Sequence, residues 1–177
     1  MKNSHQEPFL HTWTKKKFYF LNPRAEDICI EDIAHSLSLQ CRFNGHIAKH
    51  YSVAEHSILV AKAVEAQGES TLVVLAALLH DAGEAYLGDV VSPLKALLPE
   101  YKKYEKSADK CIAEKFGLPN PFPAIICKMD KIVLKDEFSF LEPFVTGAAV
   151  RELFTPIEAE NAYLETYRIL TEELANE

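Results

Sequence analysis

The chain has 177 residues and a mass of 20.0 kDa, so we expect one domain over residues 1–177. Its formal net charge of −7 disfavours a nucleic-acid polymer as partner, because sequence-independent binding of DNA or RNA needs a surplus of lysine and arginine. No apolar run is long enough to span a bilayer, and the first residues lack the apolar region of a secretory signal. We therefore expect a cytoplasmic protein with no membrane partner.

Helical periodicity recurs along the chain, and with only 6 glycines it predicts an all-α fold. Residues 13–22 carry lysines followed by an aromatic run, which predicts a short strand or hairpin at the edge of the helical body. Residues 30–39 predict the first helix, and Asn44-Gly45 predicts a turn after it. Residues 52–65 predict the next helix, because they begin with the capping-box pattern S-V-A-E.

Residues 72–79 are apolar on every side, which predicts a central helix surrounded by the rest of the protein. A charged amphipathic helix is expected to follow Pro99 and to stop at Gly117. After a proline-rich connector, another helix is expected from about residue 124. A second capping box with proline at the first helical position predicts the last helix, over about residues 155–174.

Three polar residues stand where the central apolar run ends: His80, Asp81 and Glu84. We expect the helix to continue through them, so their spacings of three and four bring the side chains to one face. Charge at the mouth of a core is costly unless it is paired or coordinated. The stretch therefore predicts a group that binds a metal and handles protons. The alternative interpretation is a helix end that turns polar as it reaches solvent.

Two further residues extend this group: His56 in the preceding helix and Asp130 in a later one. The resulting order of H, then HD, then D resembles the HD-domain superfamily of metal-dependent phosphohydrolases. The resemblance implies an HD-domain helical bundle in which His56, His80, Asp81 and Asp130 hold one divalent transition metal. Co, Mn, Zn, Fe or Ni would suit these ligands, with Mg as a further candidate. A single metal is expected because bimetallic relatives use histidines after the HD pair, whereas all seven histidines here lie at or before position 80.

The second aspartate ligand, the one that follows the HD pair in the sequence, has two candidates in the later helix. Helical phase slightly favours Asp136, which projects among the apolar residues of that helix. The pattern of the family favours Asp130, because Asp130 and Glu137 match its aspartate and the acid seven residues on. We follow the family pattern and expect Asp130 to bind the metal.

The stretches YSVAEHSILVA and ALLHDAGEAYLGD are similar to the bacterial 5'-deoxynucleotidase branch of that superfamily. This resemblance implies that Glu84 is the catalytic residue that orients a water or relays its proton. It also implies that Arg42 clamps the phosphate, that Phe43 packs on the sugar or base, and that Asp89 accepts a hydrogen bond from the 3'-hydroxyl. The residue types alone fit a surface cation at Arg42 and a core aromatic at Phe43 equally well.

The expected function is metal-dependent release of phosphate from a small deoxynucleoside phosphate, and we expect a homo-oligomer of two or more subunits. Phage dATP triphosphohydrolases of the same superfamily resemble the chain comparably well, which keeps a dNTP triphosphohydrolase as an alternative. A non-catalytic sensor of nucleotide or metal is the alternative from another class, although a pure binder has no need of Glu84. His46 and His50 lie near the site in sequence and are candidates for substrate contact.

Overall fold

Helices make up most of the computed structural model, which describes residues 7–141 and 152–177. Within these residues there are eight α-helices and two short 3₁₀ helices, which confirms the all-α prediction. The α-helices are α1 (Ile30–Leu39), α2 (Val53–Glu65), α3 (Thr71–Leu78), α4 (Glu84–Leu87), α5 (Ser92–Lys95), α6 (Pro99–Phe116), α7 (Ala124–Leu141) and α8 (Pro156–Asn176), and the 3₁₀ helices are η1 (Ala25–Asp27) and η2 (Arg42–Gly45).

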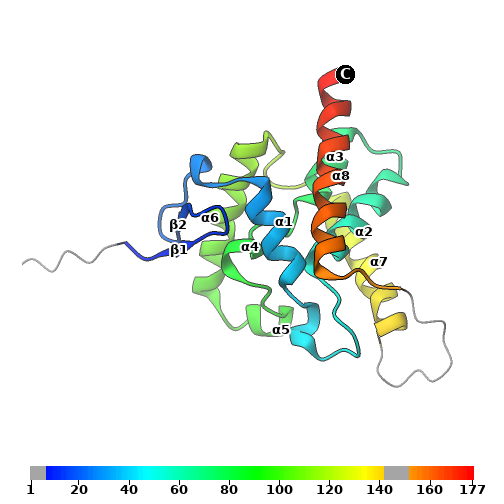
Figure 1. Ribbon diagram of the computed structural model, residues 1–177, viewed down its shortest axis with the longest axis horizontal. Helices are drawn as coiled ribbons and strands as arrows, with labels where there is room; N and C mark the ends of the chain where they lie inside the picture. Colours follow the sequence, from blue (N-terminus) through cyan, green and yellow to red (C-terminus); the bar gives the residue numbers. More distant parts are fainter. Residues whose placement is uncertain (1–6, 142–151) are drawn as a thin grey trace, which may run out of the picture.

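The predicted hairpin is present at one end of the molecule (Figure 1). Strand β1 (Phe9–His11) pairs antiparallel with β2 (Lys17–Tyr19), and Phe9 lies opposite Tyr19. The second strand falls in the predicted segment, whereas the first begins before it. The loop between the strands holds two of the three consecutive lysines.

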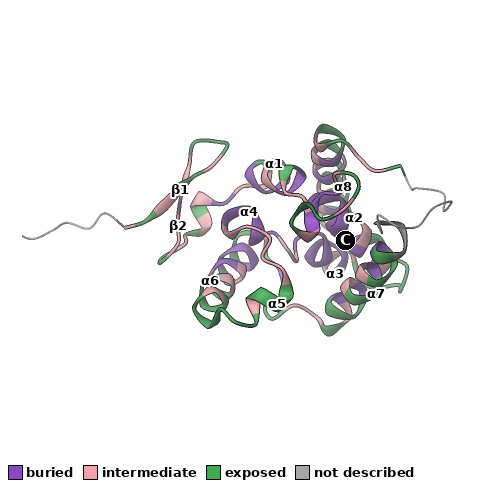
Figure 2. Cartoon of the chain, turned by 90° about the horizontal axis from the view of Figure 1, so that it is seen from below, coloured by how far each residue is buried: buried purple, intermediate pink, exposed green. Residues whose placement is uncertain are grey.

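The core forms around α3, as its apolar sequence predicts. Residues 74–79 are buried, and α2 packs against α3, α7 and α8. Figure 2 shows the buried residues of α2, α3 and α4 turned toward the middle of the helical body. Helices α1 and α8 pack against one another, and Tyr163 of α8 is fully buried in the core. The helix that precedes the His80-Asp81 pair is therefore held from several sides.

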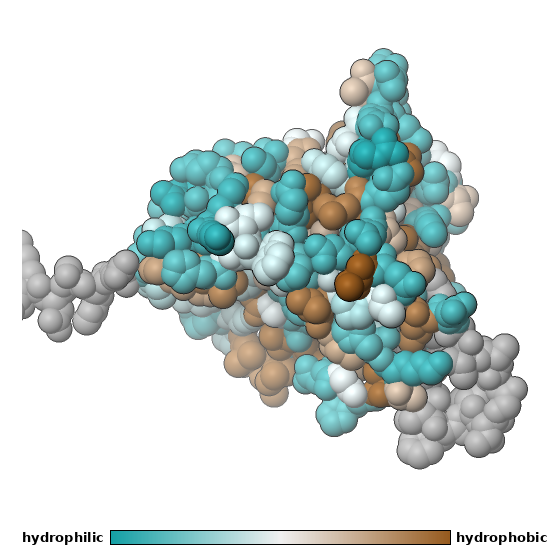
Figure 3. Space-filling view, in the orientation of Figure 1, coloured by the Kyte–Doolittle hydropathy of each residue, from teal (hydrophilic) through white to brown (hydrophobic). Residues whose placement is uncertain are grey.

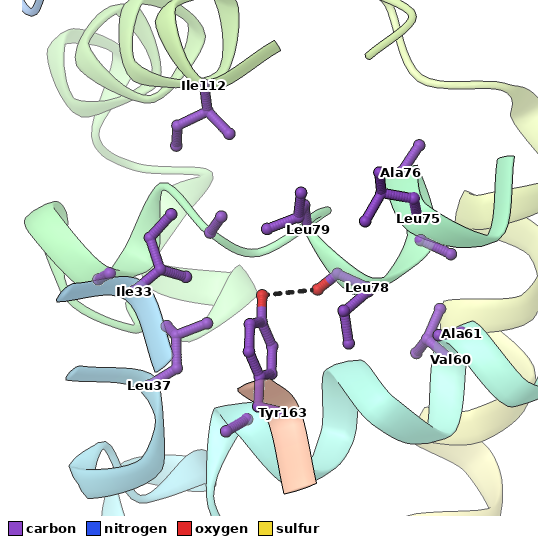
Figure 4. Close-up of a cluster of buried hydrophobic side chains, with 14 of the residues drawn as sticks. Ile33, Leu37, Val60, Ala61, Leu75, Ala76, Leu78, Leu79, Ile112 and Tyr163 are labelled. Carbon is purple, nitrogen blue, oxygen red and sulfur yellow. Dashed lines mark hydrogen bonds between the residues drawn. The ribbon is translucent and has the colours of Figure 1, made fainter. Parts of the chain in front are cut away.

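The prediction that His80 and Asp81 continue this helix is wrong, since α3 ends at Leu78. Backbone hydrogen bonds of the tighter i to i+3 kind follow, such as Glu84 N–H to Asp81 O at 2.9 Å, and form a turn before α4. Side chains bind the carbonyls left at the helix end. His80 Nδ1 donates to Ala77 O at 2.8 Å. The Tyr163 hydroxyl donates to Leu78 O at 2.9 Å (Figure 4).

The segment between α1 and α2 includes an unusual turn. Phe43, Asn44 and Gly45 have φ angles of 57°, 52° and 73°, so three successive residues are left-handed. This conformation is rare for phenylalanine and costs conformational energy. Arg42 N–H donates to Tyr51 O at 2.9 Å, which ties the turn to the segment that enters α2. The predicted turn is thus present, and it fixes Arg42 and Phe43 beside the start of α2.

The visible surface is largely polar (Figure 3). Hydrophilic residues cover most of the face shown in Figure 3, with smaller hydrophobic areas between them. In the described part of the chain, no helix combines the length and the apolar character needed to cross a membrane.

Candidate metal centre

His56 is fixed by a buried carboxylate. It lies in the first turn of α2 and has no exposed surface. Its Nδ1 donates to Glu137 Oε1 of α7 at 2.5 Å. Because an ionised carboxylate only accepts hydrogen bonds, this contact assigns the ring proton to Nδ1 and leaves the Nε2 lone pair free. A carboxylate in this position also makes the imidazole a stronger metal ligand.

His80 has the same tautomer for a different reason. Its Nδ1 donates to the backbone carbonyl of Ala77, so in the neutral imidazole Nε2 carries the lone pair that a metal would bind. The ring centroids of His56 and His80 are 5.4 Å apart. His80, in the turn after α3, therefore lies with its Nε2 near the Nε2 of His56 in α2.

The two histidines meet Asp130 of α7. Ligand atoms of His56, His80 and Asp130 all lie within 4.8 Å of one another, and His56 Nε2 is 3.1 Å from Asp130 Oδ1. Asp81 Oδ2 lies 3.2 Å from His80 Nε2 and 3.7 Å from His56 Nε2, so a second carboxylate reaches the same place. Both Nε2 atoms are buried without a hydrogen bond despite these short distances. Buried, unsatisfied nitrogens facing carboxylates fit a divalent transition metal.

The structure places Asp130 in this group and leaves Asp136 exposed on the same helix. Helical phase was misleading because the apolar residues of α7 do not share one face. Met129 and Val133 are buried, whereas Ile132 is 45% exposed.

The charges of the site favour a cation. Burial lowers the pKa of His80, but the neighbouring Asp81 carboxylate outweighs this effect, and the pKa of His80 rises to about 9. Burial raises the pKa of Asp81, but His80, His56 and Arg42 hold it below its usual range. Asp81 is thus an ionised carboxylate within a largely buried site. A metal ion would supply the positive charge that a protonated histidine otherwise provides.

Glu137 supports several of these residues at once, although its sequence position suggested no role beyond a match to the family pattern. It is fully buried and accepts hydrogen bonds from Arg42 Nη2 at 2.9 Å and from the Tyr51 hydroxyl at 2.7 Å, besides the one from His56. Burial raises the pKa of Glu137, but these partners outweigh it and lower the pKa below the ordinary glutamate value. Its position seven residues after Asp130, two helical turns along the same face, was the available signal.

A pocket of about 330 Å³ opens beside the histidines. It brings together all three residues that the resemblance assigned to the substrate, the catalytic candidate and two of the four expected metal ligands. The lining consists of Arg42, Phe43, Asp81, Glu84, Asp89, Val90, Val91, Ser92, Pro93, Lys95, Asp130, Leu134 and Phe138.

Glu84 begins α4 and lies deep in this pocket. Its Oε1 accepts a hydrogen bond from Lys95 Nζ at 2.8 Å, and its Oε2 is buried without a hydrogen-bond partner. Burial and the charge of Asp81 raise the pKa of Glu84, while Lys95 opposes them, and the result is about 8. Lys95 also lies 2.7 Å from Glu105. The sequence analysis missed Lys95, because no local pattern links it to Glu84.

The Gln40 side chain, at the end of α1, binds the backbone of both Glu84 and Asp89. Its Nε2 donates to Glu84 O at 3.0 Å, and its Oε1 accepts from Asp89 N–H at 2.9 Å. Burial is the main cause of a raised pKa at Asp89. Both ends of α4 are therefore tied to α1, which sets where the two acids enter the pocket.

The other histidines considered from the sequence do not line this pocket. His46 is exposed, and His50 Nε2 donates to the backbone carbonyl of Ser38 at 3.0 Å. The substrate contacts that we considered for them have no counterpart in the lining.

Comparison with known proteins places this arrangement in a family. Residues 53–136, which include all the candidate metal ligands, match the HD domain. The uncharacterized protein YfdR of Escherichia coli is 37% identical over 177 aligned positions, which cover 93% of this chain and 96% of YfdR. An uncharacterized protein of Rhodobacter capsulatus is 42% identical over 118 positions, 63% of this chain and 59% of that protein. With this match, and with two histidines and two aspartates at the candidate metal centre, the chain belongs to the HD-domain superfamily.

Proposed function

We propose that the protein is a metal-dependent phosphohydrolase that releases phosphate from deoxynucleoside phosphates. One observation carries this proposal: the two unsatisfied histidine nitrogens and their carboxylates adjoin a pocket that also contains a buried arginine. An arginine attracts a phosphate, and a divalent metal in this centre supplies Lewis acidity to the phosphate and to water. Arg42 then binds the phosphate, and Glu84 transfers the proton.

Arg42 is suited to hold the phosphate. It is buried, and Glu137 fixes its Nη2 while its Nε has no hydrogen-bond partner. Burial lowers the pKa of Arg42, but Glu137 and Asp81 outweigh burial and raise it, so the guanidinium stays charged. A charged group fixed before the substrate arrives needs little rearrangement to stabilise charge that develops on the phosphate.

Glu84 is suited to handle the proton. In the proposed reaction the oxygen of water attacks phosphorus, and the bond between phosphorus and the ester oxygen breaks. The proton of the water passes to the Glu84 carboxylate and then to the departing oxygen. A pKa of about 8 lies near neutral pH, where a group can both accept and return a proton. A cation in the metal centre would lower this raised pKa and favour the carboxylate.

A dNTP triphosphohydrolase is the second candidate, and one feature favours it. A second hollow of about 290 Å³ shares Asp81, Glu84 and Lys95 with the first and is also lined by Lys102 and Lys106 of α6, beside the acids Glu105 and Asp109. Lysines near the reacting centre would suit the additional charges of a triphosphate.

A panel of deoxynucleoside mono- and triphosphates, with added Mn²⁺ or Co²⁺, tests the proposal. Inorganic phosphate released from monophosphates supports the deoxynucleotidase, and inorganic triphosphate released from triphosphates supports the second candidate. If nucleotides bind but neither product forms with any metal, the protein is a sensor and the proposal fails. Repeating the assay with the chelator EDTA should abolish turnover.

A further inference from the structure

The lining of the pocket beside the metal centre combines two chemically different groups of residues. One group is charged and includes Arg42 and the candidate ligand Asp130. The other is apolar and includes Phe43 together with Leu134 and Phe138, which come from the helix that carries Asp130. A ligand with an anionic group and a flat apolar group would match both.

Three of the lining residues are evenly spaced along α7. Asp130, Leu134 and Phe138 follow one another at intervals of four residues, so they share one face of the helix. Eight residues of α-helix rise by about 12 Å. Phe138 therefore lies two turns along the helix from the candidate ligand Asp130, and both residues line the pocket.

Phe138 is 53% exposed although it is a large aromatic residue at a pocket wall. Its ring contacts that of Phe43 with centroids 5.3 Å apart and an angle of 54° between the planes. The Arg42 guanidinium also lies over the Phe43 ring, 5.3 Å from its centroid. Phe43 thus contacts both a fixed cation and Phe138, and its backbone is in a left-handed conformation. Strain of this kind is most often retained where a side chain serves a binding site.

We propose that Phe43 and Phe138 form an aromatic platform on which the base of the nucleotide stacks while its phosphate lies at Arg42 and the metal centre. This inference rests on the proposed function and adds a binding subsite for the base to it. Stacking on an aromatic ring suits any base, because every base has a π face. Phe138 is the new element, since nothing in the sequence pattern pointed to it.

Equilibrium binding to the full-length protein in EDTA tests the platform without any need for catalysis. The two ligands are deoxyadenosine 5'-phosphate and 2-deoxyribose 5-phosphate, which share the phosphate and sugar and differ in the base. Phe138→Ala should weaken the binding of the first relative to the second by roughly 5- to 150-fold, the range for loss of one stacked base. Phe138→Leu should show the same direction of change, because leucine keeps apolar surface but has no π face. Phe138→Tyr should restore the wild-type ratio.

Ile132→Ala is the matched control, because Ile132 is 45% exposed on the same helix and does not line the pocket. It should leave the ratio of the two affinities unchanged. An unchanged ratio in Phe138→Ala, or equal weakening for both ligands, would overturn the platform. A wild-type protein that hydrolyses no nucleotide but shows the base-dependent ratio would refute the proposed function and keep the platform.

Discussion

Replacing Glu137 by glutamine should weaken both the fold and the metal centre. The carboxylate accepts hydrogen bonds from Arg42, Tyr51 and His56 and has no exposed surface. Glutamine has one acceptor oxygen, so its amino group must face at least one of these donors. Breaking a buried ion pair by removing one partner costs about 3–5 kcal/mol. For a domain of this size that corresponds to a melting temperature lower by roughly 6–20 °C.

Metal binding should weaken as well, because the glutamine no longer fixes the His56 ring as a carboxylate does. Loss of such a partner lowers metal affinity by roughly 10- to 100-fold. The assay is thermal unfolding of the chelated protein by circular dichroism, followed by titration of the same preparation with Co²⁺. Asp136→Asn is the control, since it removes one charge from the neighbouring, exposed position of the same helix.

A Glu137→Gln protein with wild-type melting temperature and wild-type Co²⁺ affinity would refute the reasoning. Lower stability with unchanged Co²⁺ affinity would show that Glu137 supports the fold alone. Each measurement therefore bears on one part of the argument.

Five other substitutions test four further predictions. His80→Ala should abolish bound metal and activity while helical content, measured by circular dichroism, stays near wild type; full metal occupancy would contradict the site. Asp130→Asn should remove metal and Asp136→Asn should leave most activity, and elemental analysis with rate measurements would expose the reverse order. Glu84→Gln should keep metal while turnover falls by roughly 10²- to 10⁴-fold, the contribution of general acid-base catalysis; a metal-loaded variant at wild-type rate would remove Glu84 from the mechanism. Burial raises the pKa of Cys111 to about 11, so between the ordinary thiol pKa and pH 11 the unfolded chain loses this proton first and stability falls as pH rises. Denaturant unfolding of Cys111→Val should show a shallower fall over that range, and an identical slope would contradict the shift.

The positions of several helices follow from the local sequence, because periodicity and capping patterns involve residues only a few positions apart. The first helix was predicted over residues 30–39 and is found there. Thr155 and Glu158 form the predicted capping box at the start of α8. At the start of α2 only half of the predicted box is present: the Ser52 hydroxyl accepts the Glu55 N–H at 3.0 Å, whereas the Glu55 carboxylate accepts the Phe154 N–H at 3.1 Å. A cap requires only neighbouring atoms, so its residues predict it without knowledge of the fold. The residue order H, HD, D also indicated the superfamily, since it is a property of the chain alone.

The tertiary structure decided what no local pattern encodes. Central helix α3 ends at Leu78, because the Tyr163 hydroxyl, 85 positions away in sequence, and the His80 ring bind its last carbonyls. The contact of Glu137 with His56 joins residues 81 positions apart, and its contact with Arg42 spans 95. Such pairs form only when α2, α7 and the η2 turn pack together, so their partners depend on the arrangement of whole helices rather than on spacing along one of them.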